Sequence, residues 1–141
     1  MPELEGATKW LNSNGARKRD LIGKKPILIH FWSISCDSCK KVMPQLNKLR
    51  NDNKGQIHVI AVHMPRSKKD MDSDEVKRAA KKHDIIQPIF IDNEHKLTNA
   101  FGVKFVPAYY LFDTDDRLRY SHSGNGGLSM LQKRVDRVLG K

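Results

Sequence analysis

Two cysteines, Cys36 and Cys39, are the residues of this sequence best suited to chemistry, and they are its only cysteines. Because two residues separate them, their side chains can close a small disulfide ring and open it again. A thiolate attacks a disulfide and a thiol does not, and an ordinary cysteine with a pKa of about 8.5 is mostly protonated at neutral pH. The first turn of a helix favours the thiolate through its unpaired N–H groups. The spacing therefore predicts a redox-active pair.

The two cysteines are expected to have different roles. Cys36 is predicted to be the exposed nucleophile, and Cys39, one helical turn further along, the deeper resolving thiol. Cys36 would form a mixed disulfide with a substrate, and Cys39 would then release that substrate and leave a Cys36–Cys39 disulfide. This chemistry needs no cofactor, and we expect none.

Other interpretations of the pair remain open. Two cysteines at this spacing can supply half of a zinc site, but no His-x₃₋₅-His pair lies near a suitable knuckle, so no metal is expected. A peroxide-reducing cysteine would not need Cys39 at this position. A purely structural disulfide would stabilise little, because the loop that it closes is so short. A redox-inactive binding module is a further alternative.

The elements that must position the cysteines can be read on either side of them. Residues 26–32 form an apolar, β-branched run that is typical of a strand buried on both faces. Beyond Cys39, apolar residues recur at helical spacing as far as Leu49, which predicts a helix over 37–53. Pro44 lies inside that helix and is expected to kink it.

The rest of the chain alternates between strand and helix patterns, which predicts an α/β fold with a mixed sheet covered on both faces. Residues 1–141 are expected to form a single domain, a size that supports a conventional core. Ser73 is expected to cap the helix that it begins. Further strands are predicted at 9–11, 16–19, 56–63, 88–92, 108–113 and 117–122, and helices at 20–23, 73–83, 94–101 and 128–139.

The charge of the chain is strongly positive, with 26 basic and 16 acidic residues and a formal net charge of +10. Such a balance can indicate an acidic partner such as nucleic acid. Here the basic residues are interleaved with acidic ones, and no run reaches five or six. We therefore expect a solvated basic surface and no nucleic-acid partner.

The sequence contains no apolar run near the ~20 residues that a membrane span needs, and its N-terminus has no signal-peptide pattern. These features predict a cytoplasmic protein that has no membrane partner, and we separately expect it to be a monomer. Export stays open, since a leader could have been removed from the chain.

Several motifs together resemble the thioredoxin superfamily. A proline five residues after the second cysteine matches that family, and so does a later Val-Pro pair at the position of its cis-proline. The N-terminal section and the segment from about 64 to 92 are similar to the TlpA/ResA-like branch, in particular to YkuV-type bacterial thiol-disulfide oxidoreductases. The residues that carry the resemblance are Phe31, Trp32, Cys36 to Lys40, Pro44 and Gly102 to Pro107.

The resemblance implies a thioredoxin-like fold with an N-terminal β extension and a central αβ insertion. It implies an enzyme that exchanges thiols and disulfides, with protein disulfides as substrates and an upstream thiol or disulfide partner. Val106 and Pro107 would contact an extended substrate segment beside the cysteines; an ordinary trans proline is the alternative. Trp32 would lie beside the site as a substrate-binding residue, or would simply be a core aromatic.

The sequence also departs from this family. His30 stands where thioredoxin has a buried aspartate, and Val42 stands where ResA-like proteins have a glutamate. A neutral imidazole can accept a proton, so His30 is a possible proton acceptor for Cys39; a buried, hydrogen-bonded histidine is the alternative. Asp37 opposes an extreme lowering of the pKa of Cys36. We therefore expect mainly a reductant, with disulfide formation or a redox relay as the alternative.

Overall fold

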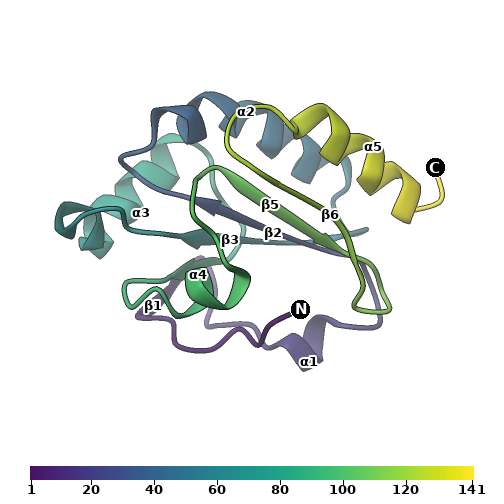
Figure 1. The fold of residues 1–141 in the computed structure, drawn as a ribbon, viewed down its shortest axis with the longest axis horizontal. Coiled ribbons are helices and arrows are strands. Elements are labelled where there is room, and N and C mark those ends of the chain that lie inside the picture. The colour runs from purple at the N-terminus through teal and green to yellow at the C-terminus, as the bar shows by residue number, and fades with distance from the viewer.

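The computed structural model describes all 141 residues, and its central strand is β2 (Ile27–Trp32) (Figure 1). All six residues of β2 are buried. The strand pairs in parallel with β3 (His58–His63) and antiparallel with β5 (Ala108–Phe112). Its nearly continuous apolar composition follows from burial on both faces.

The sheet has six strands in the order β1-β4-β3-β2-β5-β6. Strand β4 (Ile89–Ile91) is parallel to β3, whereas β1 (Lys9–Leu11) and β6 (Leu118–Ser123) pair antiparallel with β4 and β5 and form the two edges. The predicted mixed sheet is confirmed, as is the N-terminal β extension, which is β1.

Helices cover both faces of this sheet. Figure 1 shows α2 and α5 on one face, with α4 and the N-terminal segment on the other. Helix α2 continues through Pro44 without a break. The central insertion contributes a short 3-10 helix, a longer helix and strand β4. The helical elements are α1 (Lys18–Leu21), α2 (Asp37–Asp52), the 3-10 helix η1 (Lys68–Met71), α3 (Ser73–Lys82), α4 (Lys96–Phe101) and α5 (Leu128–Val138).

One hydrophobic cluster of 34 buried residues reaches from Leu4 to Val135. The expectation of a single domain over residues 1–141 stays a prediction, which this shared core supports. None of the helices is both long enough and apolar enough to cross a membrane.

Two local predictions are wrong. The strand predicted at 16–19 is replaced by helix α1, because β1 pairs with β4 and takes no partner from its own neighbourhood. The cap of α3 is Asp72 in place of Ser73: the Asp72 Oδ1 atom accepts hydrogen bonds from the N–H groups of Asp74 at 3.0 Å and Glu75 at 3.3 Å. A carboxylate at this position also complements the helix dipole.

Candidate active site

The two cysteines lie at the start of α2 and are joined in a disulfide, with their Cα atoms 5.3 Å apart. Cys36 is the N-cap residue of the helix, and the backbone N–H of Cys39 donates to the Cys36 Sγ atom at 3.1 Å. Strand β2 brings the chain to this point, and the three-residue loop 33–35 separates the strand from Cys36. After reduction, the same N–H group will favour a thiolate on Cys36.

Both cysteines are buried in this oxidised form. Cys36 is 3% exposed and Cys39 is 0% exposed, so the prediction of an exposed Cys36 is wrong for the disulfide state. Cys36 is covered because its sulfur packs between the first turn of α2 and the chain at Val106, whose carbonyl oxygen lies 3.7 Å from Sγ. Cys36 is nevertheless the nearer of the two to solvent, which agrees with the expected order of attack and resolution.

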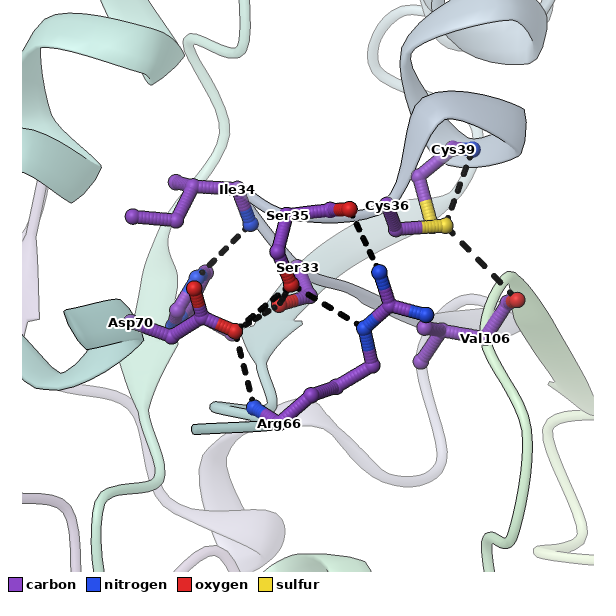
Figure 2. The surroundings of a disulfide bond; sticks show 9 residues. Ser33, Ile34, Ser35, Cys36, Cys39, Arg66, Asp70 and Val106 are labelled. Carbon is purple, nitrogen blue, oxygen red and sulfur yellow. Dashed lines mark hydrogen bonds between the residues drawn. A yellow bond between two sulfur atoms is a disulfide. The ribbon is translucent and has the colours of Figure 1, made fainter. Parts of the chain in front are cut away.

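The segment before β5 forms the second wall of the site. The Val106–Pro107 peptide bond is cis, so the alternative of an ordinary trans proline is wrong. Figure 2 shows the Val106 carbonyl group pointing at the disulfide from the side opposite α2. A disulfide sulfur carries no hydrogen, so this is a contact and not a hydrogen bond in the oxidised state. The structure therefore brings Val106 and Pro107 to the cysteines, and their contact with substrate stays a prediction.

Trp32 ends strand β2 beneath the active-site loop. It is 1% exposed, and its ring packs edge-on against His63, with ring centroids 5.0 Å apart. This burial and the contact with His63 favour the alternative of a core aromatic, and contact of Trp32 with substrate stays a prediction.

His30 is buried in the middle of the same strand, with 1% of the residue exposed. Its Nε2 atom is 2.8 Å from the side-chain amide nitrogen of Gln87 and accepts the hydrogen bond from it. Burial, with a smaller contribution from the charge of Arg50, lowers the pKa of His30 to about 3. A base with so low a pKa takes a proton poorly near neutral pH. No hydrogen bond joins His30 to Cys39, so the structure favours the alternative of a buried, satisfied histidine.

One carboxylate oxygen of Asp70, a residue of η1, accepts several hydrogen bonds that hold the active-site loop. Its Oδ2 atom accepts hydrogen bonds from the Ser33 hydroxyl at 2.9 Å, the Ser35 hydroxyl at 2.7 Å and the backbone N–H of Arg66 at 2.9 Å. Figure 2 shows these bonds converging beside the disulfide. The residue directly before Cys36 is thus bound to a segment far away in the sequence.

Two further side chains of the same segment hold the loop. Arg66 donates from Nε to the Ser35 hydroxyl at 3.0 Å and from Nη2 to the Ser35 carbonyl oxygen. His63 accepts a hydrogen bond on Nε2 from the backbone N–H of Ile34 at 3.1 Å. Every residue of the 33–35 loop therefore has a partner in the segment from His63 to Asp70.

The electrostatics of this network are set by burial and hydrogen bonding. Burial opposes the ionisation of Asp70, but the hydrogen bonds from Arg66, Ser35 and Ser33 outweigh it and hold the pKa of Asp70 below its usual range. Burial lowers the pKa of His63 to about 4, against the attraction of Asp70. Near neutral pH, Asp70 is therefore an anion and His63 is neutral, as its acceptor role toward Ile34 requires.

A model of the Redoxin family matches residues 7–138 of this sequence. The chain belongs to the redoxin family. This redoxin is similar to the thiol-disulfide oxidoreductase YkuV of Bacillus subtilis, with 54% identity over 99% of this chain and 93% of that protein. It is also similar to the thiol-disulfide oxidoreductase ResA of Bacillus thuringiensis, with 27% identity over 81% of this chain and 64% of that protein.

A solved structure supports the fold of this redoxin. The solution structure of a thioredoxin-like protein in the oxidised form matches with a TM-score of 0.90 and 53% identity, over 99% of this chain and 94% of that chain. The assignment to the thioredoxin superfamily, its TlpA/ResA-like branch and the YkuV-type proteins is confirmed. Together with the Cys36–Cys39 disulfide at a helix N-terminus, this makes the redoxin a thiol-disulfide oxidoreductase.

Sequence reasoning missed three residues that the structure places beside the loop of this redoxin: His63, Arg66 and Asp70. The sequence placed His63 at the end of a predicted strand and Arg66 and Asp70 in a polar loop, and η1 is not marked by any periodic pattern. One signal was present, since Ser33 and Ser35 alternate just before Cys36 and buried hydroxyl groups need partners. Nothing in the sequence identified those partners.

Proposed function

We propose that this thiol-disulfide oxidoreductase acts mainly as a reductant of protein disulfides. The family implies protein disulfide substrates and a redox partner. The proposal concerns the direction of electron flow, which depends on how strongly the protein stabilises its reduced form. A strong oxidant stabilises its attacking thiolate heavily, and a reductant does not.

The donor and acceptor groups around the Cys36 sulfur support this proposal. One backbone N–H, that of Cys39, donates to it at 3.1 Å. On the other side the Val106 carbonyl oxygen lies 3.7 Å away and presents negative charge to the sulfur. The side chain of Arg66 donates to Ser35 and makes no hydrogen bond with Cys36. A thiolate here gains one donor and faces one acceptor, which supports a modest stabilisation.

The reaction follows from the two sulfur positions. The Cys36 thiolate attacks one sulfur of the substrate disulfide, so that a new S–S bond forms, the substrate bond breaks and the leaving thiolate takes up a proton. The Cys39 thiolate then attacks the Cys36 Sγ atom and releases the second substrate thiol. The substrate gains two electrons and two protons, and the protein is left with the disulfide seen in the structure. A dithiol partner must reduce that disulfide before the next cycle.

The test is the reduction potential of the Cys36–Cys39 pair, measured by equilibration in glutathione buffers of known ratio. A reductant is expected to have a potential at or below about −230 mV, in the range between glutaredoxins and thioredoxin. A potential near −120 mV, typical of a strong oxidant, would overturn the proposed direction. The rate at which the reduced protein cleaves insulin disulfides gives a second measurement on the same sample, and Cys36→Ser provides the inactive control.

Three properties belong to the same proposal. We propose that the protein is bacterial, cytoplasmic and monomeric. Its YkuV and ResA relatives come from Bacillus species, which supports a bacterial source. A reducing compartment supplies the electrons that a reductant consumes. Cell fractionation tests the compartment, and size-exclusion chromatography with light scattering tests the oligomeric state.

A further inference from the structure

The guanidinium group of Arg66 is fixed at the edge of the active site, although Arg66 is an exposed residue. Two of its donors are bound to Ser35, and its backbone N–H is bound to Asp70. Figure 2 shows the side chain extending from the floor of the network up to Ser35, on the side where Val106 faces the disulfide. A surface arginine is ordinarily mobile, whereas two side-chain hydrogen bonds hold this guanidinium group in one position.

The guanidinium group of Arg66 makes no direct ion pair, and it reaches the Asp70 carboxylate only through the Ser35 hydroxyl. The structure contains six ion pairs, and none of them includes Arg66. The nearby carboxylate of Asp70 accepts from the backbone of Arg66 and not from its guanidinium group. Asp37, which follows Cys36, makes no ion pair either. An arginine presents five N–H donors in a planar fork, and those not bound to Ser35 remain free.

Phe105 is the second exposed residue next to the active site, one position before Val106 in the chain. It is 68% exposed, the largest exposed fraction among the bulky apolar residues of the chain. It directly precedes Val106, whose carbonyl oxygen lies 3.7 Å from the Cys36 sulfur. Exposed aromatic side chains next to a reactive group are typical of surfaces that bind a partner.

We propose that Arg66 and Phe105 form a recognition rim that selects disulfide substrates carrying an acidic residue and an apolar residue beside the attacked cysteine. The acidic side chain binds the free donors of Arg66, and the apolar side chain packs on Phe105. The inference rests on the proposed reduction of protein disulfides and names its substrate class. The formal charge of +10 adds a long-range attraction for acidic partners, and the fixed guanidinium makes that attraction specific at the site.

The experiment uses pre-reduced full-length protein and short peptides with one intramolecular disulfide. The residue before the attacked cysteine is Glu, Gln or Lys, and the residue after it is Leu or Ser. Single-turnover rate constants are measured for the wild type, Arg66→Gln, Phe105→Ser and Lys69→Gln. Lys69 is the matched control because it is exposed in the same segment, carries the same charge and makes no hydrogen bond with the loop.

The wild type is expected to reduce the Glu peptide about twofold to fivefold faster than the Gln peptide, as suits one exposed ion pair. Arg66→Gln removes this preference, and Lys69→Gln keeps it. Phe105→Ser removes a preference for Leu over Ser and leaves the preference for Glu in place. Rising salt weakens the Glu preference in the wild type, because the charges are solvent-accessible.

The outcomes separate this inference from the function on which it rests. If none of the peptides is reduced, the proposed reductase activity fails. If all are reduced at equal rates, the activity stands and the recognition rim is wrong. A uniform slowing of all peptides by Arg66→Gln, with a shifted pH profile for alkylation of Cys36, would assign Arg66 to the thiolate and overturn its role in substrate recognition.

Discussion

The Ser35 hydroxyl donates a 2.7 Å hydrogen bond to the carboxylate of Asp70, 35 positions away in the sequence. Ser35 directly precedes the attacking cysteine, so this bond ties the geometry of Cys36 to the central insertion of the fold. The same carboxylate oxygen also holds Ser33 and the backbone of Arg66. The insertion therefore adds a strand to the sheet and also provides the hydrogen bonds that hold the active-site loop in place.

Removal of the Asp70 carboxylate should lower both the free energy of unfolding and the rate constant for attack by Cys36. Asp70→Ala leaves three donors without their charged acceptor, and we expect it to lower the free energy of unfolding by about 2–4 kcal/mol. The misplaced loop should slow attack by Cys36 severalfold. Urea unfolding and single-turnover reduction of insulin measure the two effects. Asp115→Ala, at an exposed turn, is the control and should stay within about 0.5 kcal/mol of wild type. If Asp70→Ala and Asp115→Ala have the same unfolding free energy and the same rate constant, Asp70 does not support the active-site loop.

The buried imidazole of His30 predicts a loss of stability in acid. Its pKa falls from 6.5 to about 3 on folding, so between these values the unfolded chain binds the extra proton and the folded protein does not. Stability from this group is complete above pH 6.5 and declines as the pH falls toward 3, by a few kcal/mol.

The measurement is the free energy of unfolding in urea at several pH values from 7.5 to 4. The wild type should lose stability steadily below pH 6.5, and His30→Asn should show a clearly smaller slope, although its stability at pH 7.5 is also lower. Ser121→Ala, at an exposed position of β6 without a titratable side chain, is the control and should keep the wild-type slope. A slope unchanged in His30→Asn would show that the loss of stability in acid comes from other groups, such as the buried His63.

A substitution at Trp32 tests whether this side chain packs in the core or contacts substrate. Trp32→Phe removes part of a fully buried ring that packs against His63, and we expect a loss of about 1–3 kcal/mol in unfolding free energy. If Trp32 acts only in core packing, the rate constant for attack on a peptide disulfide should change less than twofold. A large rise in KM without a loss of stability would assign Trp32 to the substrate-binding residues.

The sequence predicted the centre of this fold well and its long-range polar contacts poorly. Strand β2 is a continuous apolar run, helix α2 carries a helical apolar period, and the Cys36–Cys39 spacing is local, so neighbouring residues were sufficient to find them. The cap of α3 was missed by one position because Asp72 and Ser73 are both good capping residues. The partner of His30 is Gln87, 57 positions away, and no local pattern reports such a pair. Asp70 was missed for the same reason, since its importance comes from the loop that it reaches.

The most direct test of Cys36 as the attacking nucleophile is to trap the mixed disulfide with Cys39→Ser. When this reduced variant is mixed with a disulfide peptide, we expect a stable covalent adduct on Cys36. Mass spectrometry after proteolysis identifies the adduct, and dithiothreitol releases it. The adduct should be absent from Cys36→Ser and short-lived in the wild type, where Cys39 resolves it. Failure to form an adduct in Cys39→Ser, or its formation on Cys39 in Cys36→Ser at the same rate, would contradict the assignment of Cys36 as nucleophile.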